Sequence, residues 1–169
     1  PICARKEQAL YLAAAKAVTP YWLAGNNSCQ TIFTVVTPML EGEILLREGR
    51  LEDGLTQLRA AIKSEDALRY DEPPGWLIPV RHSLGAALLR AGRYAEAEQV
   101  YREDLARVPA NGWSQFGLAE ALTLQHKLAE AATVRSQFEK TWSHADLTIS
   151  SSCLCQPAAT AGLPTPPAG

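Results

Sequence analysis

The sequence predicts an all-α protein, a right-handed solenoid of antiparallel helix hairpins with about three repeats and one additional N-terminal helix. Three observations predict this fold. Residues 82–109 have the pattern of a helix hairpin, the pattern recurs on both sides, and a glycine or proline stands near most expected helix ends. A single hairpin cannot bury both of its faces, so the recurrence favours a stacked array over an isolated hairpin.

The clearest hairpin lies in residues 82–109. Small and apolar residues recur there at helical spacing, and Gly85 and Ala97 leave room where two helix backbones approach closely. Gly92 can adopt the left-handed conformation that ends a first helix. Pro109 prevents a second helix from continuing. The stretch therefore predicts two short antiparallel helices.

The pattern recurs at unequal spacing. Thirty-four positions further on it continues at Leu118, Ala119, Leu122, Leu128 and Ala131. On the N-terminal side it recurs at a spacing of 43, at Gly42, Leu45, Gly49, Leu51, Leu58 and Ala61. We therefore expect a solenoid over residues 1–148, with repeats at about 36–66, 78–111 and 112–145 and an inserted loop at 66–77.

The N-terminal third predicts three helices. Residues 4–18 are rich in alanine, leucine and lysine and should form a packing helix before the first repeat. A turn should follow at residues 25–28. Thr37 can cap a helix over residues 38–48, which continues from an earlier segment at a kink. A further helix should run from Leu51 to about residue 63.

The inserted loop contains Pro73, Pro74 and Gly75, which forbid a regular helix. Tyr70 and Trp76 can pin this loop across one edge of the solenoid. Two interpretations stay open: the loop shapes a binding surface, or it fills the gap that the longer spacing creates.

At the C-terminal end, the last helix should extend to about residue 145. Residues 149–169 form a Ser/Cys stretch followed by a Pro/Ala-rich tail. Such a composition cannot bury enough apolar surface to fold alone, so we expect this tail to be disordered unless another molecule, such as a neighbouring copy, holds it.

Composition limits the partners. The chain is 47% hydrophobic and 20% charged with a formal net charge of −2, and it has neither the basic excess nor the basic run of a nucleic-acid or anionic-membrane binder. It also has no apolar run long enough to span a bilayer and no signal segment. The sequence therefore predicts no nucleic-acid partner and no membrane partner.

The four cysteines are Cys3, Cys29, Cys153 and Cys155, all outside the best repeats. They are candidates for disulfide bonds in an oxidising compartment and for free thiols in a cytosol, so the compartment stays undecided. Cys153 and Cys155 form C-x-C, which lacks the paired C-x-x-C or C…H spacing of zinc sites. We expect no metal and no cofactor.

The sequence contains no recognisable catalytic motif. Ser83 follows His82, but neighbours on a helix point about 100° apart and do not form a dyad. Neither G-x-x-x-x-G-K-[ST] nor G-x-G-x-x-G is present to cradle a phosphate. We therefore expect a protein that is not an enzyme.

The repeat pattern resembles the tetratricopeptide repeat family, whose motif begins W-x-x-L-G and ends in A…P. Over residues 41–148, runs such as DEPPGW and HSLGAALLRAGRYAEAEQVY are similar to the C-terminal region of long bacterial tetratricopeptide proteins. The chain departs from the motif at Arg81, where the family has tryptophan, at Asp104, where a small residue is usual, and at His126, which replaces a turn glycine.

The resemblance implies a groove lined by the first helix of each hairpin. The matching groove residues are Glu43, Arg47, His82, Arg90, Trp113, Phe116 and Glu120. They would bind an extended peptide of a protein partner through apolar pockets and charge-assisted hydrogen bonds. Alternatively, Trp113 and Phe116 only pack on the next hairpin. The Lys/Asn carboxylate clamp of chaperone-binding members is absent, so we expect no binding to chaperone C-termini.

Two functions remain in competition. The first is a protein-protein interaction scaffold that uses the groove. The second is a structural subunit that stacks end to end into an oligomer or filament, because solenoid ends expose apolar faces and peripheral cysteines can lock the contact.

Overall fold

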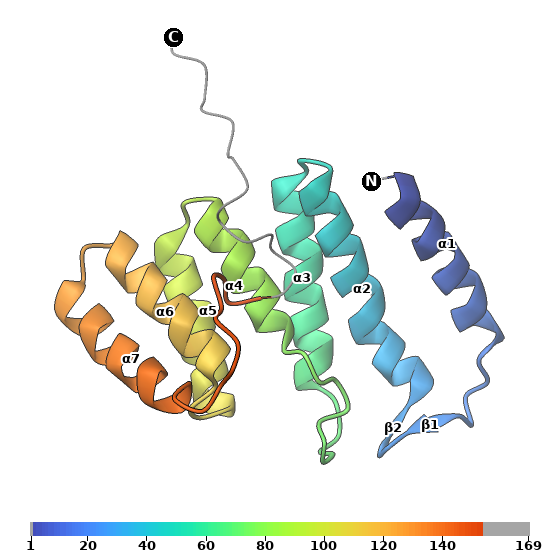
Figure 1. Ribbon diagram of the computed structural model, residues 1–169. Helices are drawn as coiled ribbons and strands as arrows, with labels where there is room; N and C mark the ends of the chain where they lie inside the picture. Colours follow the sequence, from blue (N-terminus) through green and yellow to red (C-terminus); the bar gives the residue numbers. More distant parts are fainter. Residues whose placement is uncertain (1, 154–169) are drawn as a thin grey trace, which may run out of the picture.

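The computed structural model describes residues 2–153, which fold into seven helices and one short β-hairpin. In chain order the elements are α1 (Ile2–Ala17), β1 (Leu23–Ala24), β2 (Asn27–Ser28), α2 (Cys29–Arg47), α3 (Leu51–Asp66), α4 (Val80–Arg90), α5 (Tyr94–Arg107), α6 (Gly112–Leu124) and α7 (Leu128–Thr141). Figure 1 shows α2–α3, α4–α5 and α6–α7 as three successive antiparallel pairs, with α1 beside α2. The all-α helix-hairpin solenoid predicted from the sequence is confirmed.

The turns inside the three hairpins share one backbone conformation. Gly49 and Gly92 have φ values of 80° and 73°, and His126 has a φ of 62° at the matching turn of the last hairpin. Histidine is one of the few residue types besides glycine that occupy this left-handed region with some frequency. His126 therefore replaces the expected glycine without changing the turn.

Helix α2 begins earlier than the sequence predicted. Ser28 is its N-cap, and the Ser28 side chain accepts a hydrogen bond of 3.1 Å from the backbone N–H of Thr31. The expected cap at Thr37 is wrong, because Pro38 lies inside the helix. Val35 is fully buried in the core, and this packing outweighs the low helix propensity of the β-branched segment before the proline.

The other predicted boundaries shift by a few residues. Helix α3 extends to Asp66, so the inserted loop occupies residues 67–79. Helix α7 ends at Thr141 instead of near residue 145, and a turn follows in which Ala145 N–H donates to the Trp142 carbonyl at 3.0 Å.

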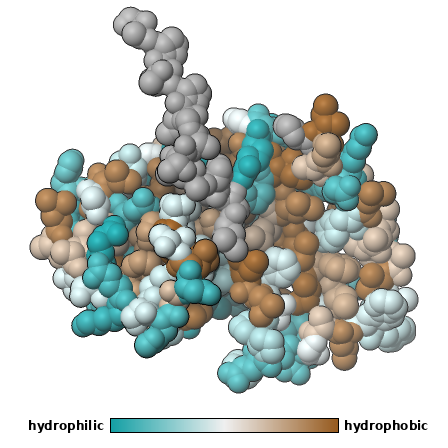
Figure 2. Space-filling view, in the orientation of Figure 1, coloured by the Kyte–Doolittle hydropathy of each residue, from teal (hydrophilic) through white to brown (hydrophobic). Residues whose placement is uncertain are grey.

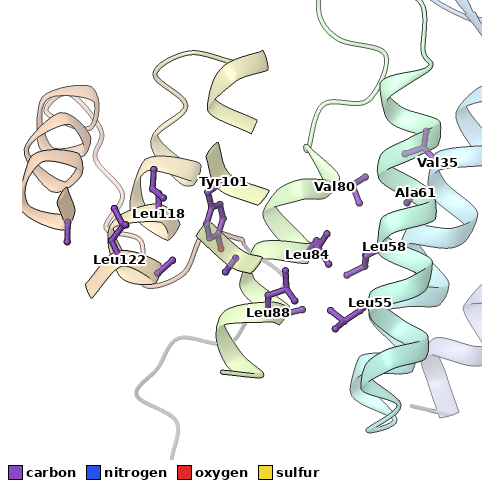
Figure 3. Close-up of a cluster of buried hydrophobic side chains, with 14 residues drawn as sticks. Val35, Leu55, Leu58, Ala61, Val80, Leu84, Leu88, Tyr101, Leu118 and Leu122 are labelled. Carbon is purple, nitrogen blue, oxygen red and sulfur yellow. The ribbon is translucent and has the colours of Figure 1, made fainter. Parts of the chain in front are cut away.

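The core runs through all three hairpins (Figure 3). At its centre the Tyr101 ring of α5 lies between α4 and α6, and a Cβ atom added at Gly85 or at Gly117 would come within 2.3 Å of that ring. These two glycines therefore create the slot that the tyrosine fills, since interiors are packed too tightly to absorb such an overlap.

Ion pairs link the second helices of successive hairpins. Arg59 of α3 pairs with Glu96 of α5 at 2.8 Å, and Arg102 of α5 pairs with Glu130 of α7 at 2.9 Å. The two pairs occupy equivalent repeat positions. They are largely exposed, so they contribute little stability individually and mainly mark the regular stacking.

Helix α1 is attached mainly through polar contacts. Gln8 is its only buried residue, and Arg5 pairs at 2.6 Å with Glu41 of α2 and with Glu48, the C-cap of α2. Tyr11 shares a hydrogen bond of 2.9 Å with Thr37. Among the seven described helices, none combines the length and the apolar character that a membrane crossing requires.

Candidate functional site

The residues that the sequence predicted for a groove lie on the first helices of the hairpins. Glu43 and Arg47 are on α2, His82 and Arg90 on α4, and Trp113, Phe116 and Glu120 on α6. Their side chains have different surroundings. Arg47 and Arg90 are exposed, His82 is buried, and the other four are partly buried.

His82 belongs to a buried polar network between three helices. Its Nε2 atom lies 3.2 Å from Asp104 Oδ2 of α5 and 3.0 Å from Asn111 Nδ2. The Ser114 hydroxyl donates to the same Asp104 oxygen at 2.6 Å. Because His82 is only 5% exposed, its side chain links α4, α5 and α6 inside the protein. The exposed surface of the predicted groove is formed by neighbouring side chains.

The network also explains why Asp104 stands where the repeat pattern favours a small residue. A buried carboxylate is tolerated only when hydrogen bonds satisfy its oxygens. Here the donors come from α6 and from the turn before it.

Trp113 and Phe116 pack against α7. Trp113 meets Trp142 edge to face at a centroid distance of 5.7 Å, Phe116 meets Phe138 at 5.6 Å, and Phe138 stacks on Trp142 at 5.5 Å. These are favourable aromatic geometries. The two aromatic residues therefore have the packing role that the sequence left as an alternative, although Trp113 also lines the cleft described below.

Two carboxylates on this face have raised pKa values. Burial raises the pKa of Glu43, against the opposing effects of a hydrogen bond from Ser83 and of the charges of Arg47 and Arg90. Its Oε1 atom is buried and lacks a hydrogen-bond partner among the described residues. Burial likewise raises the pKa of Glu120, partly offset by Arg135. An unsatisfied acceptor such as Glu43 Oε1 is suited to a donor from a bound molecule.

Residues 147–153, which we call the C-terminal strap, return from α7 across α6 to α4 (Figure 1). Trp142 Nε1 donates to the Leu147 carbonyl at 2.6 Å. The Tyr101 and Ser152 hydroxyls share a hydrogen bond of 2.5 Å, and the Ser83 hydroxyl lies 3.8 Å from Cys153 Sγ. Buried groups of α4 and α5 therefore hold Ser152 and Cys153 on the solenoid, and the Pro/Ala-rich tail that the sequence predicts to be disordered follows them. Residues 154–169 lie outside the described part of the chain.

A cleft of about 700 Å³ opens beside Cys153. The inserted loop forms one wall through Trp76, and the ends of α3, α4, α5 and α6 form the others. Two buried donors in this lining lack a hydrogen-bond acceptor among residues 2–153: Trp76 Nε1 and Arg81 Nε. Arg81 Nε lies 3.8 Å from Glu103, while the other guanidinium nitrogens bond Asp66 at 2.7 and 2.8 Å.

Glu65 lies in the same lining. Its carboxylate accepts from Val80 N–H at 3.1 Å, at the start of α4. Burial raises the pKa of Glu65 to about 7, and this is the largest influence on it. The cleft therefore contains a carboxyl group that titrates near neutral pH.

The inserted loop is held in place by the β-hairpin. Asn27 donates from Nδ2 to the Arg69 carbonyl at 3.1 Å and accepts from Arg69 N–H at 2.8 Å, and Asn26 N–H donates to Asp71 at 2.8 Å. Tyr70 is 76% exposed, so the prediction that it pins the loop is wrong. Trp76 does pack against the core.

The described cysteines differ in exposure and in oxidation state. Cys3 is an exposed free thiol on α1, and Cys29 is a partly buried free thiol at the start of α2. Cys153 is disulfide-bonded, and Cys155 lies outside the described residues. Within residues 2–153, no three His, Cys, Asp or Glu side chains are grouped so that they could hold a metal ion.

Sequence reasoning missed the contact between Tyr101 and the strap. One signal for it was present, because Gly85 and Gly117 mark the two sides of a slot for a large side chain. Nothing in the composition of residues 147–153 indicated which face they would cover.

A comparison with protein-family models, curated proteins and solved structures found no match to this chain.

Proposed function

We propose that this chain is a non-enzymatic protein-protein interaction scaffold of the tetratricopeptide kind, which binds an extended segment of a partner protein across the face of α2, α4 and α6. One observation carries this proposal: a stretch of the chain itself lies against α4, where Ser152 and Cys153 are buried and contact Tyr101, the His82 carbonyl and Ser83. A surface that accepts one segment without regular secondary structure has the shape and the hydrogen-bonding groups to accept another.

The polar groups around the strap support the same function. Glu43 Oε1 is a buried acceptor, and Trp76 Nε1 is a buried donor in the adjoining cleft, each without a partner among the described residues. A peptide backbone carries both N–H donors and carbonyl acceptors. It therefore supplies a partner for each kind of group.

Display of a random peptide library against the full-length chain carrying Ile149→Asp and Ser152→Asp, two buried charges that expel Ile149–Cys153 from the face, tests the proposal. Selected peptides should lose binding to an Arg90→Glu variant, because Arg90 is on α4 at the rim of the face. The matched control is Lys140→Glu, which makes the same charge reversal on α7. Peptides that bind this parent chain and both of its charge-reversal variants equally, or a library that yields no binder, would contradict the proposal.

A second candidate function is end-to-end self-assembly, which a different observation favours. Large apolar residues are exposed at the N-terminal end: Leu10 at 65%, Tyr21 at 89%, Trp22 at 63% and Leu23 at 70%. Figure 2 shows apolar residues over this end of the molecule. Exposed apolar surface of this kind marks interaction sites, and a heterologous contact between solenoid ends generates rings or filaments.

Sedimentation with and without reductant tests the second candidate. Assembly predicts oligomers that a Trp22→Asp substitution disperses, and reductant should weaken them if Cys3, which is exposed on α1, locks the contact. A monodisperse monomer under both conditions would contradict it.

A further inference from the structure

Three side chains of the strap are buried, and two of them, Ser152 and Cys153, contact α4 or Tyr101. Ile149 is 9% exposed, Ser152 is 1% exposed and Cys153 is 7% exposed. Leu147, Thr148 and Ser150 point to solvent. Recognition of an extended segment through some positions and not others is how peptide grooves select sequence.

The site around Ser152 is the most selective part of this contact. The Tyr101 hydroxyl reaches it because Gly85 and Gly117 leave the ring a passage between α4 and α6. Ser152 then donates to the His82 carbonyl at 3.5 Å while it shares a hydrogen bond of 2.5 Å with Tyr101. Both hydroxyls are buried, so each needs its partner. A side chain larger than serine does not fit a position that is only 1% exposed.

We propose that the strap is an internal ligand of the face of α4 and α6, and that the partner presents a segment in which an aliphatic residue is followed three positions later by serine, replacing Ile149 and Ser152. This inference rests on the proposed function and specifies it further. The serine occupies the Tyr101 site, and the aliphatic residue fills the place of Ile149.

Tethering makes the strap a strong competitor. It follows α7, which ends at Thr141, after a short connection. A segment held by so short a connection acts at an effective concentration in the millimolar range. An external segment therefore binds only when the strap has left the face, and the strap acts as an autoinhibitory contact.

A peptide added in trans tests this inference in the full chain. The probe is a synthetic peptide with the sequence of residues 147–153, in which serine replaces the cysteine. The receptor is an opened variant that combines Ile149→Asp with Ser152→Asp, because two buried charges expel the strap. Titration calorimetry should give an affinity at least tenfold higher for the opened variant than for wild type, which the tethered strap blocks.

Two controls make the result specific. Tyr101→Phe in the opened variant keeps the ring and removes the hydroxyl, so peptide affinity should fall about fivefold to tenfold. A peptide with alanine at the position of Ser152 should lose a similar factor. Circular dichroism confirms that the variant retains its helices, and the single Ser152→Asp variant replaces it if it does not.

The outcomes separate this inference from the proposed function. A folded opened variant that does not bind the peptide, or binding that is equal for wild type and opened variant, overturns the internal-ligand inference. Library-selected peptides that still bind across Arg90 would then leave the scaffold function standing. Failure of both the strap peptide and the library would reject the two together.

Discussion

The middle of the solenoid and its N-terminal helix are held by different kinds of contact. Around α4, α5 and α6 the contacts are buried: Tyr101, Leu84 and Leu88 are at most 2% exposed. Helix α1 relies on Arg5 and on polar side chains, and its Leu10 remains 65% exposed. In a stacked array, inner hairpins gain two apolar neighbours and a terminal helix gains one. The comparison therefore predicts that equal substitutions have very unequal effects at the two places.

The largest difference should come from removing one large side chain in each region. Tyr101→Ala should lower the free energy of unfolding by about 3–5 kcal/mol, the usual cost of deleting a buried aromatic side chain. Leu10→Ala on α1 should change it by less than about 0.5 kcal/mol, because Leu10 is mostly exposed. Urea unfolding followed by circular dichroism measures both. Similar losses for the two variants would show that α1 is integrated as tightly as the centre.

Overpacking the tyrosine slot should have the next largest effect. Gly85→Ala adds a Cβ atom that would lie 2.3 Å from the Tyr101 ring, so we expect a loss of about 1–3 kcal/mol in the free energy of unfolding. The loss should largely disappear in a Tyr101→Ala background, where the ring is absent. A double-mutant cycle measures this coupling. Additive effects would mean that Gly85 is required for a reason other than the ring.

A pH effect should distinguish the cleft from the rest of the molecule. The pKa of Glu65 is about 7 in the folded chain, against an ordinary value of 4.5. Between these values the folded state binds more protons than the unfolded state, so the contribution of Glu65 to the free energy of unfolding falls as pH rises from about 4.5 through 7. Glu65→Gln cannot titrate and should remove this dependence.

Urea unfolding of wild type and Glu65→Gln at pH 5 and pH 8 gives the measurement. Wild type should lose stability relative to the variant as the pH increases. Groups other than Glu65 titrate in both proteins and cancel in the difference. A difference that is the same at both pH values would show that Glu65 ionises in the folded chain near its ordinary pKa.

The smallest effect is expected at α1. Arg5→Ala removes the ion pairs to Glu41 and Glu48, so amide protection in α1 should fall while protection in α4 and α6 stays unchanged. Hydrogen exchange followed by mass spectrometry resolves the two regions. Raising the salt concentration in wild type should act in the same direction, since exposed pairs are screened. Unchanged protection in α1 would point to Tyr11 and its neighbours as the principal attachment.

The sequence was most informative where repeats set the structure. Gly85, Gly92 and Ala97 predicted a hairpin, its close helix contact and its turn, because these features depend on local backbone geometry and residue size. The start of α2 could not be predicted in this way. Burial of Val35 is a tertiary effect, and it outweighs the local signals of β-branched residues and Pro38.

The candidate site was predicted only in part. The matching repeat positions placed Glu43, Arg47 and Arg90 on one face correctly, since helical periodicity determines which residues share a side. They could not reveal that the His82 side chain is buried and bonds Asp104, because Asp104 belongs to a neighbouring helix. They also could not reveal the strap, whose contact with Tyr101 joins residues 51 positions apart.

Both the autoinhibitory contact and the proposed peptide site require the strap to be seated on the face of α4 and α6. Hydrogen exchange of the backbone amides of Ile149–Cys153 in the full-length chain tests this directly. We predict exchange well below the rate of an unstructured peptide in wild type, and faster exchange in Tyr101→Phe with α4 and α6 unchanged. Exchange of these amides at the unstructured rate in wild type would contradict the account.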